Sequence, residues 1–167
     1  MGKVNLKFLA LVPLLLFFLL AVSGCGGLTV LNFDTVSKNP DSVYSQSESP
    51  LITVISSKPS AVPGISLEDQ RLLDDIDYSQ DIVLVILFGY GASRDDSVIN
   101  VWQLKEVIWV QAVFLTPPAD AVKTSPYQII KISKAQMPRF GKLTFRLLDD
   151  DMQEKAKAVQ VVSSVSR

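Results

Sequence analysis

Residues 82–88 read IVLVILF, an apolar run without a polar interruption that follows Asp81 and precedes Gly89. Four of the seven residues are valine or isoleucine, which pack well in strands. A strand with one face in water alternates apolar and polar residues, whereas a continuous apolar run is typical of a strand that is covered on both faces. The run therefore predicts the central strand of a small sheet.

A short helix is expected upstream of this strand, as a cover for one side of the sheet. Ser66 can accept a hydrogen bond from the free amides of a first helical turn, and acidic residues favour that end of a helix. Both signals are present, because Glu68 and Asp69 follow Ser66 closely. The apolar positions expected to face the sheet are Leu67, Leu72, Leu73 and Ile76.

Further strands are predicted by short apolar segments bounded by proline, glycine or polar residues. A first strand is expected within residues 26–39, on the apolar run 28–33, and the Ser- and Pro-rich residues 39–50 read as a loop. The remaining strands are expected at residues 51–55, 98–104, 107–115, 125–134, 142–148 and 156–162. The chain is therefore predicted to be mainly β, a single small antiparallel sheet or sandwich domain with one short helix.

The segments 98–104 and 107–115 are separated only by Lys105 and Glu106, which predicts a tight hairpin although two-residue turns prefer glycine or asparagine. Trp102 and Trp109 lie near this turn and are expected to come close across the two strands. Two interpretations stay open for them. The indoles complete a core, or one of them stays exposed and anchors a partner.

The N-terminal segment has the layout of a secretory signal. Lys3 and Lys7 precede residues 8–23, which carry no charge, and small residues follow. A transmembrane helix is the rival interpretation, but sixteen residues reach only about 24 Å at about 1.5 Å each, and Pro13 interrupts the helix. We therefore favour a signal peptide over residues 1–24.

The tetrapeptide Val22-Ser23-Gly24-Cys25 resembles the lipobox of bacterial lipoproteins. The resemblance implies cleavage between Gly24 and Cys25 and lipidation of the Cys25 thiol, so that Cys25 anchors the mature chain in a membrane. Two or three acyl chains make such an anchor effectively permanent. The expected location is the cell membrane or an outer membrane, with the body facing the periplasm or the exterior. An ordinary signal in which the cysteine has no role is the alternative.

The chain contains no histidine, and Cys25 is its single cysteine. The missing histidine removes the commonest general base near neutral pH and every Ser-His or Cys-His catalytic arrangement. A lipidated Cys25 also leaves no disulfide and no thiol nucleophile. The net charge is −1 for the full chain, and loss of residues 1–24 takes away two lysines. This charge argues against a nucleic-acid surface, which needs clustered lysine and arginine.

Two sequence features suggest a ligand but do not predict one. Gly89-Tyr90-Gly91 lacks the third glycine and the following helix of a phosphate-binding loop. Clusters of aspartate occur at residues 149–151 and at 74, 75 and 77, but a calcium loop spaces its oxygens at alternate residues around a glycine. We interpret these clusters as solvated turns and expect neither a metal nor a cofactor.

The order of these motifs resembles the bacterial lipoprotein domain named after the protease-complex subunit PrcB. Its most specific pieces are Thr124-Ser125-Pro126-Tyr127 with the strand around Ile130-Lys131-Ile132, and Asp77-Tyr78-Ser79 before the central strand. The resemblance covers residues 28–134. Residues 25–27 would be the lipidated N-terminus and a short tether, and residues 135–167 a C-terminal hairpin extension packed on the same domain. The family implies a lipoprotein that stabilises or regulates a secreted or surface protease without catalysis of its own.

We therefore expect a membrane-anchored interaction module that binds another exported protein, such as a protease. The turn 89–97 and the loop 117–124 are the expected binding loops, because binding residues usually lie on exposed loops. The partner-binding residues expected are Tyr90, Arg94, Trp102 and Trp109.

Two other functions stay open. The first is a loop-inserting protease inhibitor. The second is a hydrolase with paired carboxylates such as Asp95 with Asp96 or Asp149 with Asp150. Two-carboxylate chemistry needs groups about 5 to 9 Å apart on opposite sides of a bond, and neighbours in a turn are poorly placed for it.

Overall fold

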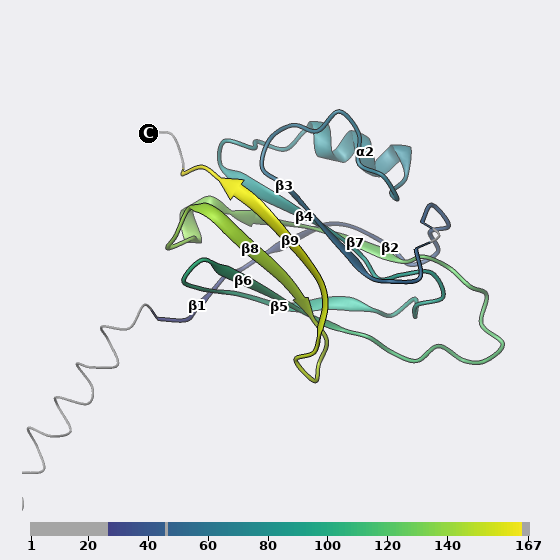
Figure 1. Cartoon of the computed structure of the whole chain (residues 1–167). Coiled ribbons are helices and arrows are strands. Elements are labelled where there is room, and N and C mark those ends of the chain that lie inside the picture. Colours follow the sequence, from purple (N-terminus) through teal and green to yellow (C-terminus); the bar gives the residue numbers. More distant parts are fainter. Residues whose placement is uncertain (1–26, 46, 165–167) are drawn as a thin grey trace, which may run out of the picture.

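The computed structural model describes residues 27–45 and 47–164, and in them two β-sheets pack face to face with one short α-helix on the far side of one sheet (Figure 1). The first sheet has five strands in the order β1 (Thr29–Val30), β5 (Ser97–Leu104), β6 (Val107–Val113), β8 (Gly141–Leu148) and β9 (Glu154–Val162). The second has four in the order β2 (Asp34–Asn39), β7 (Tyr127–Ser133), β4 (Asp81–Leu87) and β3 (Leu51–Ile55). The helix is α2 (Leu67–Asp74), and a short 3-10 helix, η1 (Lys134–Gln136), follows β7. The prediction of a mainly β sandwich with one short helix is confirmed. The segment predicted to be a signal peptide, with Gly24 and Cys25, lies outside the described residues.

The space between the two sheets holds the larger hydrophobic core. Both sheets contribute to it, and the C-terminal hairpin of β8 and β9 supplies several of its members. Among its fully buried side chains are Leu84, Ile130, Ile108, Leu143 and Phe145. The hairpin is therefore an integral part of this core and not a surface attachment.

Strand β4 is central to the four-stranded sheet and is covered on both faces, as the continuous apolar run predicts. Ile82, Leu84 and Ile86 belong to the core between the sheets, whereas Val83 and Val85 belong to a second core beneath α2. Strand β7, beside β4, divides its residues in the same way: Ile130 and Ile132 face the first core, and Tyr127 and Ile129 face the second.

Helix α2 begins after Ser66, whose hydroxyl accepts a hydrogen bond from the Asp69 amide at 3.0 Å, as the capping pattern predicts. The predicted apolar face is only partly correct. Leu73 is buried in the second core, but Leu67 and Leu72 are exposed. The helix instead turns Asp69 inward, where the Tyr127 hydroxyl donates a hydrogen bond to its carboxylate. The helix therefore faces the sheet with Asp69, and not with Leu67 and Leu72 as the sequence predicts.

The N-terminal region forms two strands where one was expected. Thr29–Val30 pairs with β5, and Asp34–Asn39 pairs with β7 at the edge of the other sheet. The chain changes sheets between them, and Leu31 enters the shared core there. Residues 34–39 were not expected to form a separate strand, because an edge strand with mostly exposed side chains carries no apolar alternation.

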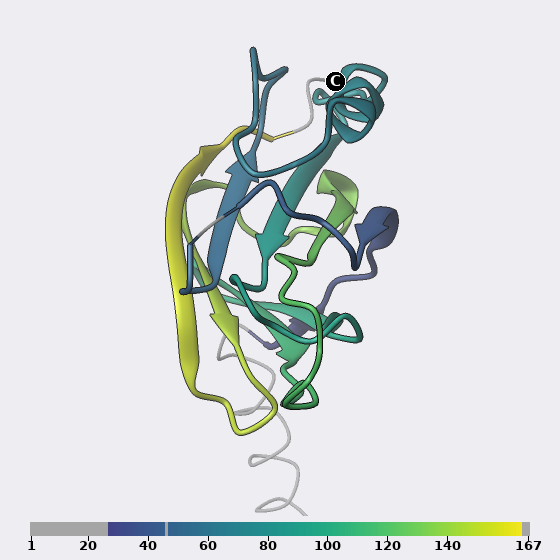
Figure 2. The ribbon, with the colours of Figure 1, turned by 90° about the vertical axis from the view of Figure 1, so that its right-hand side faces the viewer.

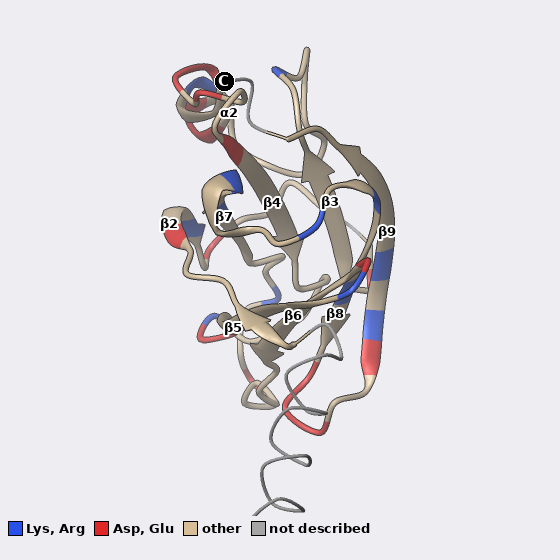
Figure 3. Cartoon of the chain, turned by 90° about the vertical axis from the view of Figure 1, so that its left-hand side faces the viewer, with Lys and Arg blue, Asp and Glu red and all other residues tan. Residues whose placement is uncertain are grey.

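The remaining strands lie close to their expected positions. Trp102 pairs directly with Trp109 across the β5–β6 hairpin. Strand β8 then pairs with β6 in parallel, the one parallel pairing recorded in the described parts of the chain. On its other side β8 pairs with β9, and β9 lies beside β3 of the second sheet, where Gln160 Nε2 donates to Ser56 Oγ at 2.9 Å (Figures 1 and 3). The sandwich is thus closed along this side.

Candidate functional site

Three connections gather at one end of the sandwich, which faces the viewer in Figure 2. They are residues 40–45 with 47–50, 88–96 and 114–126, and we call them together the loop end. Backbone hydrogen bonds tie them to one another: the Tyr90 amide donates to the Ser47 carbonyl at 2.7 Å, and the Gly91 amide donates to the Thr124 carbonyl at 2.7 Å. A third bond of 2.7 Å joins the Ser125 amide to the Ser42 carbonyl.

A glycine at a close approach and a buried carboxylate also fix the conformation of the loop end. Gly89 has a φ of +105°, and a methyl group in place of its hydrogen would lie 2.6 Å from the Glu48 carbonyl oxygen. Only glycine allows the two loops to approach so closely in this conformation. Asp96 is buried and its carboxylate accepts from the Leu115 amide at 2.7 Å and from the Ser93 amide at 3.2 Å. Burial raises the pKa of Asp96 above its usual value, although these amides oppose the shift.

Five large apolar side chains are exposed at the loop end. Tyr90, one of the predicted binding residues, is exposed there with the Lys123 ammonium 6.0 Å from the centre of its ring. Arg94 is also exposed there and forms an ion pair with Asp41. The other exposed apolar residues of the loop end are Val43, Tyr44, Leu115 and Val122. Clusters of this kind are typical of protein-binding surfaces.

Trp102 and Trp109 do not join this cluster, because they lie on the outer face of the five-stranded sheet. The strand pairing places one row of side chains across all five strands: Val30, Trp102, Trp109, Arg146 and Lys157. Both indoles are half-buried and belong to neither core, and the Arg146 guanidinium lies 5.2 Å from the centre of the Trp109 ring. We call this surface the tryptophan face. The four predicted binding residues are therefore divided between two separate surfaces.

A hollow of about 330 Å³ lies near the start of the described chain, beyond the end of β5. Lys105 and Arg139 line it together with Gly27, Leu28, Thr29 and Pro138. The buried side chain of Gln103 donates to the carbonyls of both Lys105, at 3.0 Å, and Arg139, at 3.2 Å. Gln103 thus joins the backbone at Lys105 to the backbone at Arg139.

The carboxylates considered for hydrolysis have other contacts. Asp96 holds two backbone amides of the loop end, and the buried Asp149 accepts from the Gln153 amide at 2.7 Å and pairs with Lys155 at 2.8 Å. The Lys155 ammonium holds the pKa of Asp149 below its usual value. Asp95 and Asp150 are exposed neighbours of these two residues. Asp149 is a buried turn residue, which the interpretation of its cluster as a solvated turn missed.

No group of acidic, cysteine or histidine side chains in residues 27–45 and 47–164 is arranged to hold a metal ion. The same residues contain no helix long and apolar enough to cross a bilayer. These two findings concern the described residues alone.

Sequence reasoning did not find the hollow or the cationic half of the tryptophan face. Lys105 and Arg139 are far apart in the sequence, and only the fold of β5 and of the segment before β8 brings them together. Arg146 reaches Trp109 because β8 runs parallel to β6, a pairing that no local pattern predicts. Apolar and polar residues alternate in 142–148, and this alternation places Arg146 on the face opposite Phe145. It was the one sequence signal that Arg146 lies on the outer face of the sheet.

Comparison with family models, with curated proteins and with solved structures found no match to this chain.

Proposed function

We propose that this protein is a lipid-anchored, exported interaction module without catalytic activity, which binds and stabilises another exported protein, with a secreted or surface protease as the partner class. The observation that carries the proposal is the loop end, a cluster of exposed apolar side chains on loops that are fixed by hydrogen bonds. The lipobox-like tetrapeptide at residues 22–25 and the resemblance of residues 28–134 to the PrcB-like domain supply the anchor and the partner class.

A binding role suits the loop end because its shape is set before a partner arrives. Loops that must be ordered on binding lose affinity, at a cost of about 0.5–1.5 kcal/mol for each immobilised flexible side chain. Here three loops already share backbone hydrogen bonds, and Asp96 fixes the start of the third loop through the Leu115 amide. Tyr90 and Arg94 offer the side-chain types that are enriched where binding energy concentrates.

The loop end and the start of the described chain lie on different parts of the molecule. Strand β5 leaves the loop end at Ser97 and ends at Leu104, beside the hollow that Gly27 lines (Figure 1). Eight residues of strand span about 26 Å at about 3.3 Å each. An anchor at Cys25 would therefore hold the other end of β5 and leave the loop end accessible.

The test is purification of the protein from its own membranes, with mass spectrometry of the chain and of any protein cross-linked to it. We expect a diacylated or triacylated N-terminal Cys25 and one stoichiometric partner. The double variant Tyr90→Ser with Val122→Ser should lower the yield of that partner at least tenfold. Leu67→Ser is the matched control, since Leu67 is also a highly exposed apolar residue but lies on α2.

Two outcomes would contradict the proposal. An unmodified Cys25 with the signal still attached would remove the anchor. Equal partner yield from the loop-end variant and from the Leu67→Ser control would remove the loop end as the binding surface.

A protease inhibitor is the second candidate, and the loop 114–126 favours it. Its residues 118–123 are exposed, and it is fixed at both ends, by Asp96 at Leu115 and by the Gly91 amide at Thr124. Between these two ends the Ala121 amide donates to the Pro118 carbonyl at 3.0 Å, so a turn presents the exposed residues. Titration of a partner protease with the purified protein separates the two functions. A scaffold leaves the turnover of the protease unchanged or raises it, whereas an inhibitor abolishes it. A substitution at Val122 or Ala121 should then restore the turnover.

A further inference from the structure

We propose that the tryptophan face and the hollow beyond the end of β5 lie against the anionic phospholipid headgroups of the membrane that holds the anchor. The inference rests on the proposed lipid anchor at Cys25, and it adds an orientation: the five-stranded sheet faces the bilayer, and the four-stranded sheet with α2 faces away. The occupant of this face is a lipid surface.

The chain between the proposed anchor at Cys25 and the hollow is short. Gly27 lines the hollow with Lys105 and Arg139, and Cys25 precedes it by two residues. Two residues of fully extended chain span at most about 7 Å. A lipidated Cys25 would therefore hold headgroup phosphates close to a hollow that Lys105 and Arg139 line.

The tryptophan face has the side-chain types that are typical of the membrane interface. Tryptophan is enriched where proteins meet the headgroup layer, because its ring is apolar and its N–H is polar. Both tryptophans of the chain lie on this face. Exposed apolar side chains surround them on the same side of the sheet, at Val30, Leu104, Val159 and Val161. An outer sheet face that stays in water would carry polar residues at these positions.

The two sides of the molecule also differ in charge. Lys142, Arg146 and Lys157 project from the outer side of β8 and β9, and Arg146 pairs there with Glu154 at 3.1 Å. Exposed acidic residues border this side, with Glu106 next to Lys105 and Asp150 and Asp151 in the β8–β9 turn, so the cations outnumber the anions only along the two strands. The opposite side of the molecule, around α2, is acidic (Figure 3), with Glu68, Asp74, Asp75 and Asp77 exposed there. An anionic surface attracts the first side and repels the second, since each lysine or arginine near such a surface contributes about 1 kcal/mol.

The loop end remains free in this orientation. Tyr90 and Arg94 lie on connections at the end of the sandwich, and the tryptophan face lies on the side of one sheet (Figures 1 and 2). Membrane contact and partner contact therefore use different residues, so each can be removed without the other.

The test uses the intrinsic fluorescence of the full chain, purified from membranes and reconstituted into vesicles. Because the chain has only two tryptophans and both lie on this face, its tryptophan emission reports on this face alone. Lipids brominated along the acyl chain quench tryptophans that sit at the membrane interface. We expect strong quenching and a blue-shifted emission in vesicles that contain phosphatidylglycerol, little quenching in pure phosphatidylcholine, and loss of the effect at high salt.

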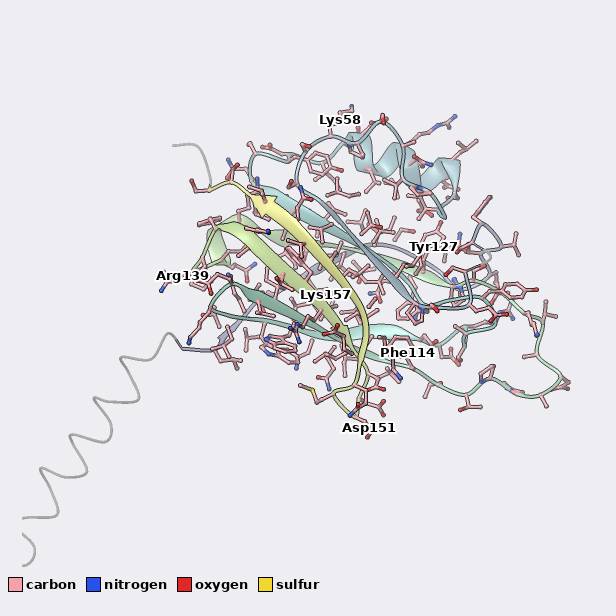
Figure 4. The ribbon with its side chains drawn as sticks, in the orientation of Figure 1. Lys58, Phe114, Tyr127, Arg139, Asp151 and Lys157 are labelled. Carbon is pink, nitrogen blue, oxygen red and sulfur yellow. The ribbon has the colours of Figure 1, made fainter. Side chains whose placement is uncertain are left out.

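Substitutions sharpen this test. The double variant Lys105→Gln with Arg139→Gln should lower the ratio of docked to undocked protein about fivefold for each cation removed. Lys58→Gln is the matched control, because Lys58 is an exposed lysine on the α2 side, far from Arg139 in Figure 4, and pairs with Asp74 at 3.1 Å. Its quenching should equal that of the unsubstituted protein, and far-ultraviolet circular dichroism confirms that each variant is folded.

The outcomes separate this inference from the proposed function. An acylated chain whose tryptophans are quenched equally in both vesicle types, or not at all, overturns the orientation and leaves the anchor intact. Tryptophan shielding that rises with protein concentration in the absence of lipid, together with dimers in sedimentation, assigns the face to a second copy and also overturns it. A chain without acyl groups refutes the anchor, and then quenching in anionic vesicles still supports the lipid-binding face while its absence overturns it.

Discussion

The outer faces of the two sheets differ, although both sheets pack their inner faces against the same core. On the four-stranded sheet the outer side of β4 and β7 is covered by α2 and the segment before it, with a second core of Val83, Val85, Ile129 and Leu73 beneath. On the five-stranded sheet the corresponding side carries the tryptophan face, with half-buried indoles and exposed valines. The covered face stabilises the fold, and the uncovered face is the one proposed to meet a membrane. Substitutions at matched positions test this division.

The largest difference is expected at α2, which supplies the cover. Leu73→Ala should lower the free energy of unfolding by about 2–5 kcal/mol, because Leu73 is fully buried and the sheet beneath it cannot fill the space. Leu72→Ala is the control, since Leu72 is exposed on the same helix, and it should change stability by less than about 1 kcal/mol. Urea unfolding followed by circular dichroism measures both. Equal losses would show that α2 does not cover the sheet through Leu73.

A smaller loss is expected from the polar contact beneath the same helix. The Tyr127 hydroxyl donates to Asp69 and accepts from the Ser66 amide at 3.0 Å. Tyr127→Phe should therefore lower stability by about 1.5–3 kcal/mol, the usual range for a hydrogen bond to a charged group. Tyr44→Phe is the control, because Tyr44 is exposed at the loop end, and thermal unfolding should show no shift for it. A stable Tyr127→Phe variant would mean that Asp69 is satisfied by its serine contacts alone.

The same conservative change on the two outer faces tests the division most directly. Val85→Thr places a hydroxyl beneath α2, where Val85 is 1% exposed, and should cost about 1–3 kcal/mol because that hydroxyl finds no partner. Val159→Thr makes the same change on the tryptophan face, where Val159 is 48% exposed, and should stay within about 0.5 kcal/mol. Chemical denaturation of the two variants, side by side, gives the difference. If Val159→Thr cost as much as Val85→Thr, the uncovered face would have a structural role.

The smallest effect is expected from pH. Burial raises the pKa of Asp69, but hydrogen bonds from Ser37, Tyr127 and Ser66 outweigh it, and the pKa lies below the usual 3.8. Asp69 therefore contributes stability above pH 3.8 that is lost as the pH falls through its folded pKa. Asp96 has the opposite sign, since its pKa lies above 3.8, and protonation of Asp96 on acidification favours the folded state.

Stability measured from pH 6 to pH 2.5 checks both signs. The difference between the unsubstituted protein and Asp69→Asn should shrink as the pH falls. The difference for Asp96→Asn should grow over the interval just above pH 3.8. Parallel curves for both variants would contradict the assigned pKa directions.

The covered face was predictable from sequence, because a continuous apolar run in residues 82–88 implies cover on both sides and the capping pattern at Ser66 locates the helix. The hairpin pairing of Trp102 with Trp109 was predictable for a similar local reason. The parallel pairing of β6 with β8 was not, since it joins segments separated by the whole of β7. Every missed functional feature, including the contact of Arg146 with Trp109 and the hollow that Lys105 and Arg139 line, depends on such distant pairing.

The inward turn of Asp69 was missed for a different reason. Helix patterning assigns buried positions to leucine, and the sequence gives no sign that Tyr127, on a strand far downstream, brings a hydroxyl to the same place. The strand Asp34–Asn39, in which Val36 is the one apolar residue, escaped detection because its partner β7 supplies most of the apolar surface. Tertiary contact overrides local propensity at both positions.

The pairing of β8 with β6 also determines when the five-stranded sheet can finish folding during synthesis. Strand β6 finds its neighbour β5 as soon as their hairpin has been made, but its second edge stays open until Gly141–Leu148 has been synthesised and delivered. Open edges recruit strands from other chains. A product that stops before Gly141 would therefore be prone to aggregate, and the chain would reach its final shape only after β8 had been made.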